Sequence, residues 1–172
     1  WSKLFRKELI ADIRFPEGRK SEDIMYTTRA LVKALRCVFL DTPYYNYMMD
    51  RETSIMNSKY HERRFQDEIP FWREQAAYLA KCGYGQLARK AHHQFYRKML
   101  FYYEDFRDRG MQESAVQLAD LLCGEKEMIR DIYKEGFVPR GDQARMKLFL
   151  ANPGWFYRVV KLYEKVVIPL RQ

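Results

Sequence analysis

The sequence has little cysteine and lacks the segments that place a protein across a membrane or export it. Its three cysteines, Cys37, Cys82 and Cys123, are odd in number, far apart and embedded in apolar runs. This pattern favours buried, reduced thiols over a disulfide framework. No run of about 18 apolar residues could span a bilayer, and no stretch has the pattern of a signal peptide. We therefore expect a cytoplasmic protein.

Metal-ligating patterns are missing as well. The histidines His61, His92 and His93 have no carboxylate or cysteine at the spacing of a metal site, and we predict exposed helix positions for them. No Asp-x-Asp occurs, and the Asp-x-x-Asp at Asp105 and Asp108 falls in an apparent helix. The sequence therefore predicts no metal ligands in this chain.

Apolar residues and positive charge are plentiful. A length of 172 residues suits one domain, and a hydrophobic fraction of 47%, with 16% aromatic, is ample for a core. The 31 basic residues outnumber the 23 acidic ones and give a net charge of +8, which favours an anionic partner such as a nucleotide diphosphate or a phospholipid surface. Nucleic acid is disfavoured as a partner because bases and acids are interleaved on most helices and no nucleic-acid motif occurs.

Hydrophobic periodicity predicts a helix over residues 21–36. Apolar residues recur there at helical spacing, and Ser21 stands where an N-cap is expected. Pro16 and Gly18 mark a turn just before it. Glu22 and Asp23 then fall in the first helical turn, where the helix dipole favours acids for purely structural reasons. Residues 1–10 indicate a short helix or turn.

The rest of the chain is predicted to be helical except for one aromatic segment. Residues 37–40 form a short apolar run typical of a buried strand, and residues 44–48 suit a second strand. Helical patterns follow over 60–82, 86–109, 111–123, 125–135 and 142–170, the last interrupted at residues 152–154. The predicted fold is mainly α: a helical bundle with one or two short β-strands.

Several short motifs in the first 58 residues occur in a recognisable order. They are Trp1-Ser2-Lys3-Leu4-Phe5, Phe15-Pro16-Glu17-Gly18, Glu22-Asp23, Pro43-Tyr44-Tyr45-Asn46-Tyr47, and Arg51 with Ser54-Ile55. In order and spacing they resemble the C-terminal half of bacterial family 2 glycosyltransferases, enzymes of capsular and exopolysaccharide biosynthesis with an A-type α/β fold. By this resemblance, residues 1–58 are the C-terminal part of the catalytic domain and residues 59–172 a helical extension.

The resemblance implies inverting transfer of a sugar from a nucleotide-diphosphate donor to a hydroxyl of a glycan or lipid-linked acceptor. It makes Asp23 the catalytic base, with Glu22 orienting it or meeting the acceptor. Lys3 and Trp1 would border the site where donor and acceptor meet. Arg51, on a loop that would fold over the donor, would pair with its diphosphate. The chain departs from the pattern here, because Met48 replaces a frequent basic residue and the spacing from Tyr47 to Ser54 is one residue longer than usual. A solvated loop arginine is the alternative for Arg51.

The nucleotide-sugar half of such enzymes has no counterpart in the chain. The Mg²⁺ or Mn²⁺ ion implied for the full enzyme would have its ligands in that half, so we expect the isolated chain to be inactive. The alternative is a function of a different class, a non-catalytic helical interaction module. In that case Glu22 and Asp23 are present only because acids stabilise the first turn of a helix.

The last 33 residues concentrate the positive charge. Residues 140–172 contain seven bases and two acids, a net charge of +5, among apolar and aromatic residues. This basic amphipathic pattern predicts contact with an anionic membrane surface, peripheral at the inner face of the plasma membrane. The alternative is that the apolar face packs onto the preceding helices.

Overall fold

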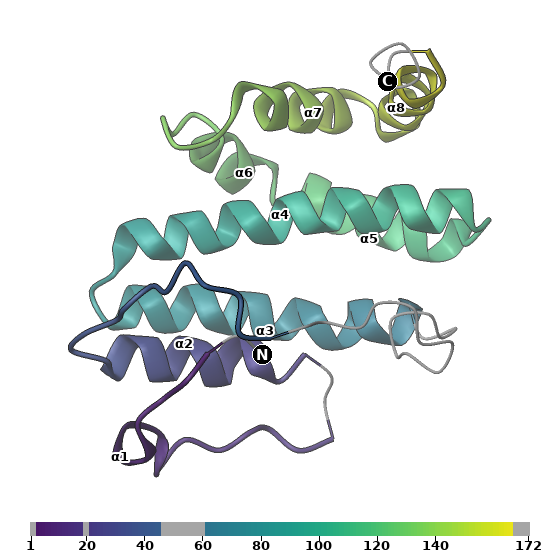
Figure 1. Ribbon diagram of the computed structural model, residues 1–172. Coiled ribbons are helices and arrows are strands. Elements are labelled where there is room, and N and C mark those ends of the chain that lie inside the picture. The colour runs from purple at the N-terminus through teal and green to yellow at the C-terminus, as the bar shows by residue number, and fades with distance from the viewer. Residues whose placement is uncertain (1–2, 19–20, 46–60, 167–172) are drawn as a thin grey trace. The chain divides into compact units, whose positions relative to one another are not determined.

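All regular secondary structure in the described part of the chain is helical, which confirms a mainly α protein (Figure 1). The computed structural model describes residues 3–18, 21–45 and 61–166. The chain divides into two compact units, residues 1–88 and residues 89–172, called unit 1 and unit 2 below. The boundary falls in the first turn of α4, Gly85–Asp108.

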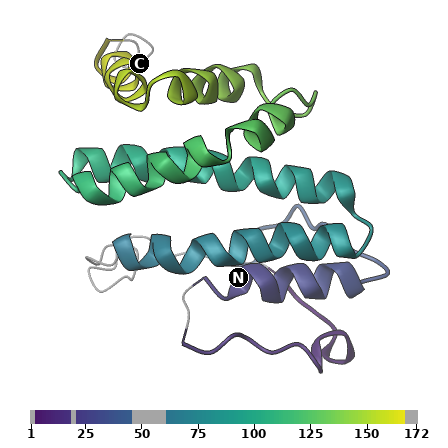
Figure 2. The ribbon, with the colours of Figure 1, turned by 180° about the vertical axis from the view of Figure 1, so that it is seen from behind.

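The described residues of unit 1 form the helices α1 (Lys7–Ile10), α2 (Asp23–Lys33) and α3 (His61–Lys81). Helix α2 lies alongside α3, as both ribbon views show (Figures 1 and 2). It buries Met25, Thr28 and Ala30 against α3. The Gln75 amide donates a 2.7 Å hydrogen bond to the Thr28 hydroxyl, so a buried polar side chain of α2 has its partner on α3.

Unit 2 contains most of α4 together with α5 (Gln112–Gly124), α6 (Lys126–Ile132), α7 (Arg140–Ala151) and α8 (Pro153–Val166). Apolar residues that recur at helical spacing along these helices form its core, although Met128 of α6 is 42% exposed. Buried members include Phe95, Met99, Tyr102, Phe106, Leu118, Leu122, Ile129, Ile132, Met146, Phe149 and Phe156. The predicted interruption at residues 152–154 is also confirmed, because α7 ends at Ala151 and α8 begins at Pro153.

Two glycines end long helices in the same way. Gly83, with φ of +84°, follows α3, and the backbone N–H of Tyr84 donates to the carbonyl of Leu79. Gly110, with φ of +72°, follows α4, and the N–H of Met111 donates to the carbonyl of Phe106. Both are Schellman ends, in which glycine accommodates the left-handed backbone that closes the last turn.

The predicted strand at residues 37–40 is wrong. Residues 34–45 have no regular secondary structure and form no ladder with any described residue, and Val38, Phe39 and Leu40 are exposed. A four-residue apolar run requires a partner strand to become buried, and the described ranges contain none. Of the second predicted strand, residues 44 and 45 are exposed coil, and residues 46–48 lie outside the described part.

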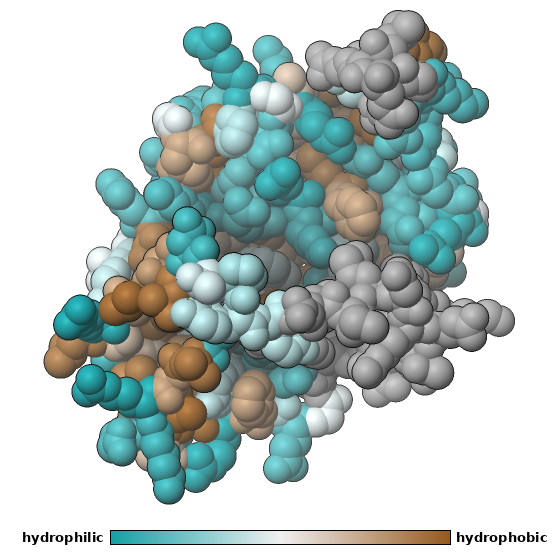
Figure 3. Space-filling view, viewed as in Figure 1, coloured by the Kyte–Doolittle hydropathy of each residue, from teal (hydrophilic) through white to brown (hydrophobic). Residues whose placement is uncertain are grey.

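Apolar side chains gather on the viewed face of unit 1 (Figure 3).

Two expectations about burial were also wrong. The cysteines are unpaired, but Cys37 and Cys82 are exposed and Cys123 is only partly buried. Cys37 lies in the irregular segment 34–45, and Cys82 follows the last residue of α3, beyond the packed turns. His93 is buried rather than exposed, because the buried side of α4 includes more positions than its apolar residues alone.

Candidate functional site

The backbone just before α2 has an uncommon conformation that the sequence did not predict. Ser21 has a φ of +64°, in the left-handed region that L side chains rarely adopt. Its hydroxyl does not cap the helix but donates a 3.0 Å hydrogen bond to Glu68 Oε1 on α3. The helix starts at Asp23 with Glu22 as its N-cap residue, so Ser21 as N-cap is wrong.

The Ser21 contact reaches a buried acid. Glu68 is 3% exposed, and its hydrogen bond joins positions 47 residues apart. A left-handed non-glycine residue costs on the order of 1–2 kcal/mol, so other contacts must hold it. We infer that docking on Glu68 supplies part of this restraint and fixes the direction in which the chain enters α2.

The entry of α2 presents the predicted acid pair to solvent. Asp23 is exposed and Glu22 is half-buried. Among the residues that the structure describes, no basic side chain pairs with either carboxylate, whereas Asp12 in the same unit is paired with Lys33 at 2.5 Å. An exposed, uncompensated carboxylate can accept a proton from a hydroxyl brought to it, which is the task of a general base.

An aromatic cluster lies one helical turn after Asp23. The Tyr26 ring stacks on Phe15, with centroids 3.9 Å apart and planes 7° apart, and Phe5 meets Tyr26 edge-on at 6.3 Å. Through Tyr26, Phe5 and Phe15, each from a different motif segment, contact the helix that carries the acids. Sequence reasoning missed Tyr26, although an aromatic three residues after the acid pair was a usable signal.

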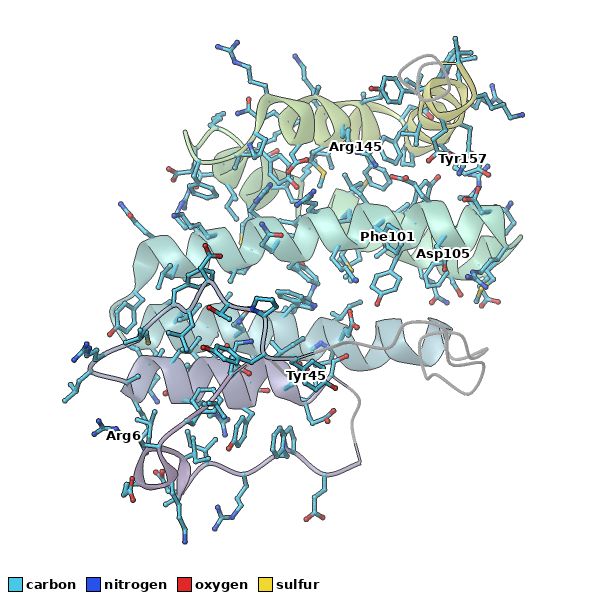
Figure 4. All side chains as sticks on the ribbon, in the orientation of Figure 1. Arg6, Tyr45, Phe101, Asp105, Arg145 and Tyr157 are labelled. Atoms are coloured by element: carbon cyan, nitrogen blue, oxygen red, sulfur yellow. The ribbon has the colours of Figure 1, made fainter. Side chains whose placement is uncertain are left out.

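Of the other predicted site residues, the structure describes only Lys3. Lys3 is exposed, two residues before Phe5. Trp1 and Arg51 lie outside the described residues. The segment leading toward Arg51 is exposed, with Tyr44 at 78% and Tyr45 at 54% of their accessible surface (Figure 4). The structure therefore brings Glu22, Asp23 and the segment beside Lys3 into one unit.

Unit 2 has a pocket of about 240 Å³ lined by Arg97, Leu100, Phe101, Tyr133, Asp142 and Arg145. His93 Nε2 lies 3.1 Å from Asp142 Oδ2, and Arg97 Nε lies 3.6 Å from the same oxygen. Arg145, labelled on α7 in Figure 4, pairs with Glu104 of α4. Each pocket arginine thus has its own acid partner.

Burial controls protonation around this pocket. It lowers the pKa of the His93 imidazole below its usual value, and the Asp142 carboxylate partly opposes the shift. It raises the pKa of the Glu104 carboxyl despite the opposing Arg145 guanidinium. The Tyr133 hydroxyl is buried, and none of the described groups accepts its hydrogen bond. We interpret the ion pairs of Arg97 with Asp142 and of Arg145 with Glu104 as a structural connection between α4 and α7, and we assign no ligand to the pocket.

The described ranges hold neither a metal-binding cluster nor a membrane-spanning helix. No three His, Cys, Asp or Glu side chains there gather closely enough to hold a metal ion. None of the helices there combines the length and the apolarity needed to cross a membrane. In comparisons with known proteins, no family model, no curated protein and no solved structure matches this chain.

Proposed function

We propose that this chain is the acceptor side of an inverting glycosyltransferase similar to the bacterial family 2 enzymes, with Asp23 as its catalytic base. The observation that carries the proposal is the exposed, uncompensated Asp23 carboxylate at the start of a helix. The Ser21–Glu68 hydrogen bond, which holds the chain where it enters α2, supports it. So does the Tyr26 cluster, in which two residues of the ordered motifs, Phe5 and Phe15, contact the helix that carries Asp23.

In the proposed reaction, an acceptor hydroxyl attacks the anomeric carbon of the donor while the nucleotide diphosphate leaves from the opposite face. Asp23 accepts the hydroxyl proton during this attack, a task that typically accelerates a reaction by about 10²- to 10⁴-fold. Glu22 is half-buried beside it and either orients Asp23 or meets the acceptor. Phe15 is 51% exposed although one face of its ring stacks on Tyr26, so its exposed surface offers an apolar contact for a sugar ring.

The donor side of the proposed reaction is assigned by resemblance alone. Lys3 and Trp1 would border the sugar, and Arg51 would pair with the diphosphate in a bidentate fork. Mg²⁺ or Mn²⁺ would neutralise the leaving diphosphate in the nucleotide-binding half, and we assign no residue of this chain to that ion.

The exposed segment 34–45 gives the proposal a second support. Leu35, Phe39 and Tyr44 are 105%, 88% and 78% exposed, an unusual density of large apolar side chains in water. We propose that this segment packs against the nucleotide-binding half. The same exposure also favours the competing function, a helical interaction module without chemistry, because such a surface would serve any protein partner.

The test is Asp23→Asn in an enzyme that also carries the nucleotide-binding half. The substitution keeps the size of the side chain and removes its basicity, so we expect sugar transfer to fall at least about 100-fold. Affinity for the nucleotide sugar should stay the same, because the base acts on the acceptor. Asp12→Asn is the matched control: this carboxylate is exposed in the same unit and paired with Lys33.

Transfer by the Asp23→Asn enzyme within a few-fold of wild type would exclude Asp23 as the base. Equal losses from Asp12→Asn and Asp23→Asn would indicate damage to unit 1 rather than loss of a base. Under the interaction-module alternative, neither substitution changes any transferase activity, because there is none to change.

A further inference from the structure

Helix α8 has a broad apolar face, and unit 2 covers only part of it. Phe156 and Val160, four residues apart, are buried. The Phe156 ring meets Phe149 of α7 edge-on at 5.4 Å and lies 6.2 Å from Tyr103 of α4. On the same side, the Tyr157 hydroxyl donates a 2.8 Å hydrogen bond to Asp108 of α4 (Figure 4). These contacts fix which side of α8 faces the unit.

The remaining part of this apolar face is exposed. Trp155, Val159, Leu162, Tyr163 and Val166 follow the i, i+4, i+7, i+8, i+11 spacing of one helical face, called the outer stripe below. Each of the five is at least 42% exposed, and Leu162 reaches 64%. A soluble bundle helix needs one apolar face for its core, so packing within unit 2 does not explain the outer stripe.

The charges around the outer stripe have one sign. Arg158 and Lys165, seven residues apart, lie along one edge of the stripe, and the Arg158 guanidinium is 5.9 Å from the Trp155 ring. The single acid of α8, Glu164, is held away from the stripe by Lys161, which also pairs with Asp108 at 2.7 Å on the packed side. A partner must therefore accept apolar side chains beside two cations that have no acid partner among the described residues.

We propose that the outer stripe binds an anionic lipid bilayer, with α8 lying in the plane of the headgroups. Trp155 and Tyr163 are of the residue types that prefer the headgroup boundary, and Arg158 and Lys165 would meet lipid phosphates. A second copy of this chain fits less well, because its outer stripe would bring the same positive edge and no compensating acid. This proposal is independent of the proposed transfer chemistry.

The test uses the full 172-residue chain and sedimentation with vesicles. We expect binding to vesicles that contain about one-third phosphatidylglycerol, weakening at high salt, and little binding to pure phosphatidylcholine. The double variant Trp155→Ser/Leu162→Ser should bind at least about tenfold more weakly. Its matched control is Phe101→Ser/Val116→Ser, because Phe101 and Val116 are 58% and 56% exposed on other helices of unit 2.

A second pair of variants tests the charge. Arg158→Gln/Lys165→Gln should lower affinity for anionic vesicles, whereas the control Lys134→Gln/Arg140→Gln, which removes two exposed bases elsewhere, should lower it less. Far-UV circular dichroism checks that all four variants keep their helices. Absence of binding at low salt, or equal loss in the variants and their controls, overturns the proposal. Concentration-dependent dimerisation that Leu162→Ser abolishes also overturns it, in favour of a second copy.

Discussion

Truncating Phe149 to alanine should destabilise unit 2 strongly. Phe149 lies on α7 and is fully buried, and its ring meets Tyr103 of α4 edge-on at 5.0 Å and Phe156 of α8 at 5.4 Å. Both pairs have the perpendicular geometry that the aromatic quadrupole favours. The side chain therefore joins three helices at one point, and no single neighbour can move to fill its place.

The expected loss in the free energy of unfolding is about 4–5 kcal/mol. Phenylalanine-to-alanine changes in cores cost about 3–5 kcal/mol, which includes the cavity left behind. The upper half of that range applies because two edge-to-face pairs are lost, each worth about 0.5–1.5 kcal/mol beyond burial. Phe149→Leu keeps most of the volume and loses the ring pairs, so we expect about 1–2 kcal/mol for it.

Urea denaturation followed by far-UV circular dichroism measures these losses. The matched control is Phe101→Ala: Phe101 is 58% exposed on α4, and we expect the variant to lose less than about 1 kcal/mol. If Phe149→Ala lost no more stability than Phe101→Ala, α7 and α8 would not be seated on α4 through this ring, and the assignment of an inner and an outer face to α8 would fail.

Two further predictions concern polar groups. Ser21→Ala should lose about 1–3 kcal/mol of stability, because it keeps the left-handed backbone and removes the hydrogen bond to the buried Glu68. Ser21→Gly should lose less, because glycine adopts this φ without strain. If urea denaturation showed the Ser21→Gly variant to be less stable than the Ser21→Ala variant, this explanation would be wrong. Burial lowers the pKa of His93 in the folded state, so the unfolded chain takes up the proton first and stability should fall as the pH drops below about 6.5. His93→Gln should make that fall shallower, and an unchanged slope in urea midpoints measured between pH 7.5 and 5 would show that His93 is not responsible for it.

Helices were predictable from the sequence because their signal is local. The apolar residues of α4 recur with the helical period, and the glycine ends at Gly83 and Gly110 require only the neighbouring backbone. The strand at residues 37–40 failed for the opposite reason. An apolar tetrapeptide becomes a strand only when another strand pairs with it, and its own residues carry no information about that partner.

The sequence predicted where the candidate site begins, but it did not predict the long-range hydrogen bond that holds it. The start of α2 was placed within two residues, because Pro16, Gly18 and the apolar period all mark it. Ser21 was misjudged because a serine before a helix usually caps it, whereas here its hydroxyl binds Glu68, 47 residues away. Long-range contacts of this kind override local preference and leave no pattern in a window of sequence.

The structure shows core packing for the tail, and the proposed membrane contact is compatible with it because the two involve different residues of α8. Phe156 and Val160 are buried in unit 2, and the outer stripe begins at Trp155 and includes Leu162. Burial of Phe156 contributes to stability, whereas the exposed Leu162 contributes little to it. Changes on the inner face should therefore alter unfolding, and changes on the outer stripe should alter lipid binding at unchanged stability. Core packing and the proposed membrane contact can therefore be tested by substitutions at different residues of α8.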